Sequence, residues 1–360
     1  MFQKGSFVDL TLYRDESGFA ALKDEWNALL RRSRVDTIFL TWEWQQTWWR
    51  YVGAARGPLY LLAVRTAGHL VAILPLYLTE EAGVRSLQVV GCIEVSDYLD
   101  LMVDAGQEDA VYTAFLDWLA SPEAPGWDVL DLCNQPQASL AHTRLPELAA
   151  ARGWGAQALE EDVCPVVTLL QEPGSLADLG QDAAWEAYLA GLDKKERHEI
   201  RRKLRRVERE APDARVVVIA GDGPEMDLDA AVDRFVYLHR LSSRAKDAFM
   251  TDDMQAFFHA IARALADHGW LRLFFLEVGG VLAASYFCFD YKDELLVYNS
   301  GYDPGASPQL SLGWVLMARV IQHAISEDTV RLDFLQGSED YKYRFGGQDT
   351  IVYRTLIRKT

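Results

Sequence analysis

The stretch LRLFFLEVGGVLAASYFCFDYKDELLVYNSGYDPGASPQLS, residues 271–311, decides the fold. It opens with two runs that are rich in aromatic and β-branched residues, 271–278 and 281–290, and these are joined by Gly279-Gly280. Because glycine adopts positive φ angles without steric cost, the pattern predicts an antiparallel hairpin with a two-residue turn.

After the hairpin, the same stretch predicts a strand, a break and a helix. A third apolar run covers 295–302, and the segment 303–308, which contains two prolines and a glycine, interrupts it before a helix is expected near Ser311. A further strand over 332–334 leads into a basic, aromatic tail that ends near Phe345. If the chain performs chemistry, we expect it at the break.

The first half of the chain repeats this order of elements. At an offset of 212 residues, which is 271 minus 59, the segment 59–72 aligns with 271–284 without a gap, and five positions are identical. We therefore expect an internal duplication of one α/β unit, while two generic hairpins would explain part of the same pattern. The elements expected in the first half are strand 8–12, helix 19–31, strands 59–65, 70–78 and 86–90, helix 108–120 and strand 127–133.

Composition indicates a globular chain with a large core. Half of the 360 residues are hydrophobic, which suits two domains. The formal charge of −17 and the pI of about 4.9 argue against broad, sequence-independent contact with nucleic acid, but they are compatible with a local basic groove. Tryptophans crowd into 39–49, where a packing role is favoured over a ligand pocket.

The cysteines and the apolar segments indicate a cytoplasmic protein. Cys92, Cys133, Cys164 and Cys288 lie in apolar or strand-like surroundings without CxxC spacing, and we interpret them as buried thiols in a reducing compartment. No long apolar segment follows Met1, so no signal peptide is expected. No segment is predicted to span a membrane.

A basic segment separates the two halves. The pattern over 185–210 predicts one helix, and 194–206 hold eight Lys/Arg against two Glu, a local charge of +6. Arg197, Arg201 and Arg205 recur every four residues, so one helix face would present guanidinium groups to a phosphate or a carboxylate. A solvated helix whose arginines pair with acidic neighbours explains the same pattern, and both interpretations stay open.

Motifs for other kinds of site are missing. The sequence has no HxxxH, CxxC, GxSxG or Walker A motif, so we expect no metal ion. The segments 228–243 and 252–268 predict amphipathic helices. His239, on the first of them, could reach a cleft, although a lone histidine on a helix is more often structural.

The chain resembles a known family. The order of helix, hairpin, strand, loop, helix and strand resembles the GNAT acyltransferase fold. The doubling, the basic helix and the ending DFLQGSEDYKYRFG, residues 333–346, are similar to the cellulose-biosynthesis (CelD/BcsL) type of GNAT protein and, more distantly, to the Fem peptidyltransferases. This implies an α/β (α+β) fold of two tandem GNAT-like domains, each a mixed, mostly antiparallel sheet flanked by helices. The implied parts are a degenerate domain 1–170, a basic connecting helix segment 171–212 and a domain with a cofactor site 213–360.

The resemblance also implies where acetyl-CoA or another acyl-CoA would bind. In GNAT enzymes two central strands splay apart, so that the pantetheine arm pairs with strand backbone and the pyrophosphate sits at the next helix N-terminus. The corresponding residues are Asn299, Ser300, Gly301, Ser307, Gln309, Ser311, Leu312 and Gly313. Gln309 and Gly313 are one residue farther apart than the family loop requires, so a plain helix start capped by Ser311 explains the loop equally well.

Direct transfer to an amine needs a base for the amine and an acid for the thiolate. The resemblance makes these the catalytic candidates: Glu339, Tyr341, Lys342 and Tyr298. Asp333 is a weaker candidate, because Asp131 occupies the matching place in the first half and lacks the tail. The residues selected for binding the acceptor are Arg197, Arg201, Asp97, Tyr98 and His239.

Three functions fit these features. The leading one is an acyl-CoA-dependent N-acyltransferase that acts on a small molecule or an envelope-linked sugar. The second is a Fem-like aminoacyl-tRNA-dependent ligase, for which the Arg197 face would hold nucleotide or RNA. The third is a non-catalytic scaffold of a polysaccharide system. The sequence predicts neither the acceptor nor the oligomeric state.

Overall fold

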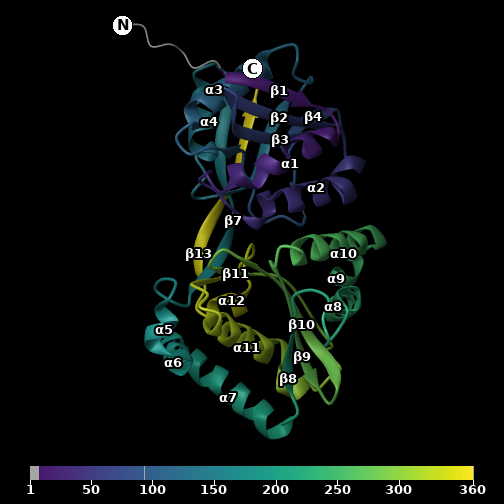
Figure 1. The fold of residues 1–360 in the computed structure, drawn as a ribbon, viewed down its shortest axis with the longest axis vertical. Coiled ribbons are helices and arrows are strands. Elements are labelled where there is room, and N and C mark those ends of the chain that lie inside the picture. Colours follow the sequence, from purple (N-terminus) through teal and green to yellow (C-terminus); the bar gives the residue numbers. More distant parts are fainter. Residues whose placement is uncertain (1–7, 93, 360) are drawn as a thin grey trace. The chain divides into compact units, whose positions relative to one another are not determined.

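The computed structural model describes residues 8–92 and 94–359 and divides the chain into two compact units (Figure 1). The first unit contains the chain up to Asp162 and its last residues from Thr350 onward, and the second unit is Val163–Asp349. The predicted domain boundaries therefore differ from these units: the basic helix belongs to the second unit, and the chain end returns to the first. The segment inspected for a signal peptide lies outside the described residues.

The first unit is a mostly antiparallel sheet flanked by helices. Its strands follow the order β1-β2-β3-β4-β6-β13-β7, with β5 paired to β3, and β4 runs parallel to β6. Trp44 and Trp48 are fully buried, so the tryptophan-rich segment is core. The elements are β1 (Val8–Tyr13), α1 (Ser17–Leu30), η1 (Ile38–Leu40), α2 (Trp42–Tyr51), η2 (Gly53–Ala55), β2 (Leu59–Thr66), β3 (His69–Glu81), β4 (Val84–Val89), β5 (Met102–Val103), α3 (Glu108–Ala120), β6 (Val129–Pro136), α4 (Ala141–Ala150), the first part of β7 (Gly155–Thr168) and most of β13 (Gln348–Arg358).

The second unit repeats this architecture. Its sheet order is β8-β9-β10-β11-β12 followed by the second part of β7, and β11 runs parallel to β12. The turn of the predicted hairpin has φ angles of 60° at Gly279 and 76° at Gly280, as expected for a two-residue turn. The elements are α5 (Ser175–Leu179), α6 (Gln181–Gly191), α7 (Lys194–Glu210), β8 (Arg215–Ile219), α8 (Leu228–Ser242), α9 (Arg244–Phe249), α10 (Asp252–Ala266), β9 (Leu271–Val278), β10 (Val281–Tyr291), β11 (Glu294–Tyr302), η3 (Pro308–Leu310), α11 (Leu312–Ser326), β12 (Arg331–Asp333) and α12 (Asp340–Arg344).

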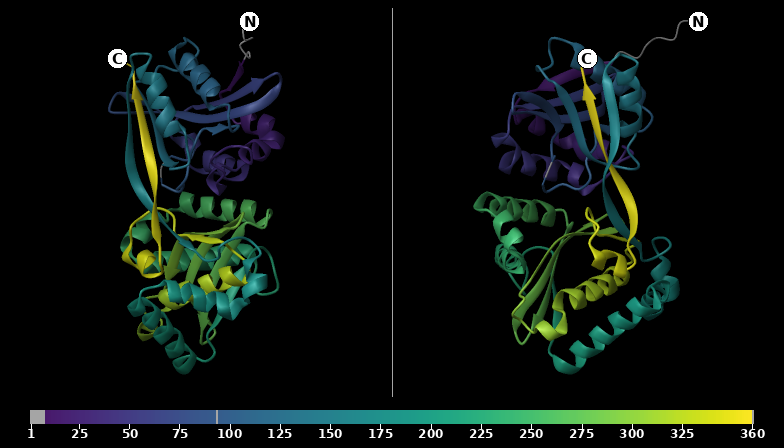
Figure 2. Two further views of the ribbon diagram at one scale, coloured as in Figure 1. Left: turned by 90° about the vertical axis from the view of Figure 1, so that its left-hand side faces the viewer. Right: turned by 180° about the vertical axis from the view of Figure 1, so that it is seen from behind.

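Helices cover both faces of the second sheet (Figure 2). Successive residues of a strand point to opposite faces. Tyr286 and Cys288 of β10 belong to the core formed with α6, α7 and α11, whereas Phe287 packs against Phe235 of α8 and Phe258 of α10. The α/β class with a mostly antiparallel sheet flanked by helices is therefore confirmed.

The predicted single helix over 185–210 is wrong, because the structure has two helices there. α6 ends at Gly191, Leu192 and Asp193 adopt extended backbone, and α7 begins at Lys194. Glycine is a weak helix former, so a break after Gly191 is inexpensive. The break lets α7 fold back and contact α6.

Corresponding strands of the two halves have the same order. The series β1-β2-β3-β4-β6 in the first unit matches β8-β9-β10-β11-β12 in the second, and in each series only the last pair is parallel. The strands that follow are exchanged. β7, which follows the first series, pairs with β12, and β13, which follows the second, pairs with β6. This exchange explains why the chain end belongs to the first unit.

The cysteine prediction is wrong for one pair. Cys92 and Cys133 form a disulfide with Cα atoms 6.1 Å apart, whereas Cys164 and Cys288 are buried free thiols. Cys92 follows β4 and Cys133 lies on β6, so sheet pairing unites two residues that are 41 positions apart. No helix among the described residues combines the length and the hydropathy needed to cross a bilayer.

Candidate functional site in the second unit

The site lies where the two parallel strands of the second unit part. β11 pairs with β12 only from Glu294 to Leu296 and then continues to Tyr302. Beyond β12 the chain turns at Leu335, whose φ is +57°, and a carboxylate oxygen of Asp333 accepts a hydrogen bond from the Leu335 N–H at 2.7 Å. Asp333 thus shapes the turn that carries the chain away from β11.

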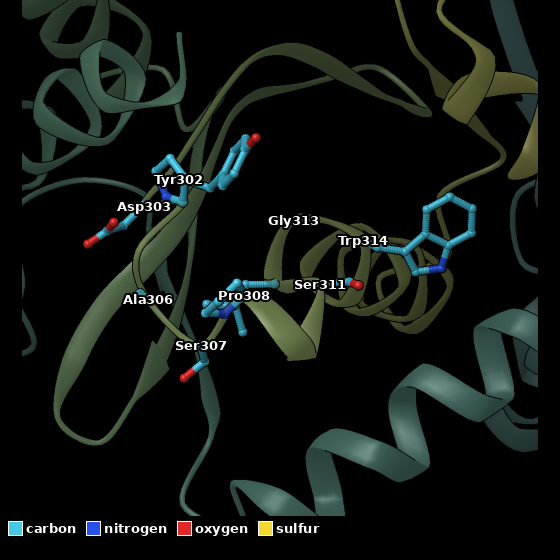
Figure 3. Close-up of a pocket in the computed structure, with 10 residues that line it drawn as sticks. Tyr302, Asp303, Ala306, Ser307, Pro308, Ser311, Gly313 and Trp314 are labelled. Atoms are coloured by element: carbon cyan, nitrogen blue, oxygen red, sulfur yellow. The ribbon is translucent and has the colours of Figure 1, made fainter.

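A pocket of about 410 Å³ lies in the loop that follows β11 (Figure 3). Residues of the segment 302–308 form one wall, and Ser311 to Trp314 at the start of α11 form the other. Of the predicted cofactor residues, Ser307, Ser311, Leu312 and Gly313 line this pocket. Gln309 is exposed in η3 and does not line the pocket.

The start of α11 is open to this pocket. Ser311 has a left-handed backbone with φ of +55°, and its side chain makes no cap hydrogen bond, so the predicted Ser311 cap is wrong. The first turn also contains no acidic residue. A Cβ added to Gly313 would meet no atom within 4 Å. The N–H groups of an uncapped first turn attract anions, so the pocket suits a phosphate group.

A buried tyrosine, Tyr286, and a half-buried one, Tyr341, pack in the core on the face of the sheet that α11 covers. The Tyr286 hydroxyl donates a hydrogen bond to the Gly313 carbonyl at 3.4 Å, which ties the helix start to β10. Burial raises the pKa of Tyr341 on α12, and the negative charge of Glu339 adds to the effect. A phenol held in this state stays protonated at neutral pH and can donate a proton to a developing anion.

Lys342 has a structural role in this geometry. Its side chain is buried, and its ammonium donates to the carbonyls of Leu335 at 3.1 Å, Gln336 at 2.6 Å and Gly337 at 3.0 Å, with the Glu339 carboxylate 2.9 Å away. These acceptors occupy all its donors. The catalytic role expected for Lys342 does not fit, because this ammonium holds the turn after β12 in place.

Lys246 is a site residue that sequence reasoning missed. Its ammonium donates to the carbonyl oxygen of Ser300 at 2.5 Å and to the Ser300 hydroxyl at 3.1 Å. Burial lowers the pKa of Lys246, and the charge of Glu339, which follows β12, opposes that shift. Lys246 thus lies within electrostatic reach of both sides of the parted strands. No sequence pattern singled it out, because α9 was not predicted.

His239 binds the same carbonyl and is buried. Its Nδ1 lies 3.1 Å from the Ser300 carbonyl oxygen, so Nδ1 carries the proton. Burial, together with the charge of Lys246, lowers the pKa of His239 to about 4. The Ser300 N–H is bonded to the Asn299 side chain at 3.3 Å. The backbone of Ser300 is therefore occupied, and a donor arm would have to displace these side chains to pair with it.

Two other predicted residues of β11 serve packing. Tyr298 bulges out of the pairing with β10, and its ring packs against Phe258 at 5.9 Å and Phe289 at 4.9 Å. A Cβ at Gly301 would lie 2.4 Å from the backbone nitrogen of His239, so a glycine is needed where α8 crosses the strand. These contacts explain both residue types without a ligand.

The arginine face of α7 is directed to α6. Arg197 donates to the carbonyl of Ala190 at 3.3 Å, Arg201 pairs with Glu186, and Arg205 donates to a carbonyl of its own helix at 3.2 Å. The second interpretation, pairing with acidic neighbours, holds for Arg201, whereas Arg197 and Arg205 donate to backbone carbonyls. The acceptor role of Arg201 does not fit, because its charge is already paired with Glu186, whereas the acceptor role of Arg197 stays a prediction.

The remaining acceptor candidates belong to the first unit. Tyr98 is buried with its ring against Phe39 at 6.2 Å, so it is part of the core of that unit. Asp97 is half-buried in the same loop and keeps its acceptor role as a prediction. No group of three or more His, Cys, Asp or Glu side chains suited to a metal ion occurs in the described part of the chain.

Comparisons with known proteins place the fold. Residues 194–343 match the family model of an acetyltransferase (GNAT) domain. The structure of FemX is similar with a TM-score of 0.63 at 10% identity, over 92% of this chain and 95% of FemX. The C-terminal domain of a putative lysylphosphatidylglycerol synthetase from Agrobacterium fabrum is similar with a TM-score of 0.55 at 11% identity, over 94% of this chain and 92% of that domain.

A third similar structure is that of L-PGS from Bacillus licheniformis, with a TM-score of 0.53 at 10% identity, over 93% of this chain and 91% of the other. No curated protein matches the chain in sequence. The chain therefore carries a GNAT acetyltransferase-type domain within a fold of two GNAT-like units.

Proposed function

We propose that this protein is an acyl-CoA-dependent N-acyltransferase that transfers its acyl group directly to the amine of a small molecule or an envelope-linked sugar. The observation that carries the proposal is the pocket between the end of β11 and the start of α11, a helix start that is uncapped and has no acidic residue in its first turn. Bound there, an acyl-CoA would supply an activated thioester. Because the proposed donor is an acyl-CoA, we also propose that the reaction takes place in the cytoplasm.

Residues on α12 supply the proton transfers in this proposal. Tyr341, which is held protonated by burial, gives a proton to the leaving sulfur as the carbon–sulfur bond breaks. Glu339 is the residue that precedes α12, and its side chain is 59% exposed and makes no cap hydrogen bond. Its carboxylate receives the proton that the attacking amine loses as the carbon–nitrogen bond forms. Lys342 and Lys246 act on either side of these two residues as positioning residues.

A second candidate is a Fem-like ligase that uses aminoacyl-tRNA. FemX and the lysylphosphatidylglycerol synthetase domain cover more than 90% of this chain in structure. The occupied Ser300 backbone counts against the first candidate, because a pantetheine arm would have to displace the side chains that are bonded there. Acceptors linked to a polysaccharide, as the CelD/BcsL resemblance suggests, are compatible with both candidates.

A thermal-shift measurement separates the candidates. A ligand present at 100 times its Kd stabilises the folded protein by about 2.7 kcal/mol, which raises Tm measurably. We expect acetyl-CoA to raise Tm and aminoacyl-tRNA to leave it unchanged. Stabilisation by aminoacyl-tRNA alone would establish the second candidate. No response to either ligand would leave a non-catalytic scaffold as the function.

A further inference from the structure

A second pocket, of about 630 Å³, lies between the first turns of α7 and the end of α12. Its lining residues are Lys194, Lys195, His198, Glu199 and Arg344. Four of these five side chains are basic or can become so. Positive charge therefore predominates around this pocket.

The two lysines of this pocket carry charge that the protein does not neutralise. Lys194 and Lys195 are exposed and have no ion pair or hydrogen bond within the described chain, and the same holds for the side chain of His198. The acidic member, Glu199, is already bound to Arg202 at 2.8 Å and lies 3.6 Å from Lys203. An anion that entered the pocket would thus meet two uncompensated positive charges.

A single tryptophan connects this pocket to the first one. The Lys203 ammonium and the Arg344 guanidinium each lie 4.4 Å from the centroid of the Trp314 ring. Trp314 lines the pocket at α11, and Arg344 lines the basic pocket. Arg344 is held by Glu196 at 2.9 Å. The Trp314–Arg344 pair therefore forms a fixed wall that the two pockets share.

We infer that the basic pocket binds a phosphomonoester group of a substrate, separate from the phosphate-binding start of α11. A phosphomonoester carries about −1.5 to −2 charges at pH 7, which matches Lys194 and Lys195. Arg344 adds a planar set of donors that suits phosphate oxygens. The inference rests on the proposed function. The group can belong to the donor, since CoA carries a phosphomonoester apart from its pyrophosphate, or to a phosphorylated amine acceptor.

The test compares ligands that differ by one phosphate. Isothermal titration gives the affinities of CoA and 3′-dephospho-CoA, and of glucosamine 6-phosphate and glucosamine, for the full chain. In the wild type we expect one pair to show at least about tenfold tighter binding of the phosphorylated member, equivalent to 1.4 kcal/mol. The double variant Lys194→Ala/Lys195→Ala should bring that ratio close to one and leave the affinity of the unphosphorylated member unchanged.

The control removes two charges from the far half of the same helix. Arg205→Ala/Arg209→Ala should keep the wild-type ratio, because Arg205 and Arg209 do not line the pocket. A preference within the CoA pair assigns the pocket to the donor, and one within the glucosamine pair assigns it to the acceptor. The inference is overturned if the affinities within both pairs are nearly equal, or if the preference for the phosphorylated ligand survives in Lys194→Ala/Lys195→Ala. Either result leaves the proposed function untouched. If neither CoA compound binds at all, the proposed function falls as well.

Discussion

The two units contain the same parallel strand pair, and the two pairs continue differently. β4 and β6 pair at three positions that end at Gln88–Asp131, and β11 and β12 pair at three positions that end at Leu296–Asp333. Beyond this point in the first unit, the disulfide Cys92–Cys133 joins the segment after β4 to β6. In the second unit no disulfide joins the corresponding described segments, and the 410 Å³ pocket lies in the loop that follows β11.

Side chains fill the first unit where the second is open. The Gln45 amide donates to the Val90 carbonyl at 3.1 Å, the Trp44 indole donates to the Ser96 hydroxyl at 2.9 Å, and the Asn134 amide donates to the Ser96 carbonyl at 2.5 Å. All of these side chains are buried. The space that a donor would need is therefore occupied by the core.

The helix starts differ in charge as well. α3 has Glu108 and Asp109 in its first turn, and the Glu108 carboxylate already accepts the Gly106 N–H at 2.7 Å. α11 has no acidic residue there. The N-terminus of α3 therefore repels an anion, whereas the N-terminus of α11 attracts one. One topology thus gives a closed scaffold or an open site, depending on a few side chains at the point where the strands diverge.

The largest expected effect comes from removing the proposed acid of the open unit. Tyr341→Phe should lower kcat by about 10²- to 10⁴-fold without changing donor affinity, because general acid catalysis contributes that much. The measurement is thiol release from acetyl-CoA with an amine acceptor found by screening. Tyr343→Phe is the control on the same helix, since Tyr343 is exposed and its hydroxyl donates to the Asp349 carboxylate at 2.9 Å. Full activity of Tyr341→Phe would refute this assignment.

A second substitution makes the open helix start resemble the closed one. Gly313→Asp places a carboxylate at the position that Asp109 holds in α3. Because nothing lies within 4 Å of an added Cβ, the fold should tolerate it. Titration calorimetry should show acetyl-CoA binding weakened by about 100-fold, equivalent to 2.7 kcal/mol. The reverse change, Asp109→Gly, should create no second binding site for acetyl-CoA. If Gly313→Asp binds acetyl-CoA as tightly as the wild type, the donor does not bind at the start of α11.

Stability should depend on pH in opposite directions in the two units. Burial lowers the pKa of His239 to about 4, so its contribution to the second unit is complete above pH 6.5 and is lost as pH falls toward 4. Burial raises the pKa of Asp100 to about 7, so its contribution to the first unit is complete below pH 3.8 and is lost as pH rises toward 7.

Hydrogen exchange, corrected for intrinsic rates, measures this contrast. From pH 7 to pH 4, the free energy of opening measured for the amides of β11 should fall by about 3 kcal/mol at most. β6 should instead be more protected in acid. His239→Gln and Asp100→Asn should each flatten the dependence of their own unit. Parallel pH profiles in both units would contradict the two burial effects.

The disulfide should affect the first unit and leave donor binding unchanged. Closing a loop of 41 residues reduces the entropy of the unfolded chain by an amount worth about 4 kcal/mol. Cys133→Ser should therefore lower the free energy of unfolding of the first unit, measured by urea denaturation. Binding of a second equivalent of acetyl-CoA to this variant would show that the disulfide, rather than the buried side chains, closes the first unit.

The sequence predicted what local patterns determine. The glycine turn between β9 and β10 and the apolar periodicity of α3 and α11 gave elements close to those observed. The exchange of β7 and β13 was not predicted, because partner strands far apart in sequence leave no local signal. The Cys92–Cys133 disulfide was missed for the same reason.

The site was predicted in part. The loop residues Ser307 and Gly313 do line a pocket, since a break between strand and helix is visible in the sequence. The roles of charged residues were harder to predict, because a spacing of four residues does not show which face a neighbouring helix covers. Arg201 faces α6, whereas the unpaired charges are those of Lys194 and Lys195.

Hydrogen exchange of the full chain with and without acetyl-CoA tests most directly the claim that the second unit, and not the first, binds the donor. Acetyl-CoA should protect the segment 302–314 around the pocket and leave 86–98 of the first unit unchanged. Protection of 86–98, or no protection anywhere at saturating acetyl-CoA, would contradict the account.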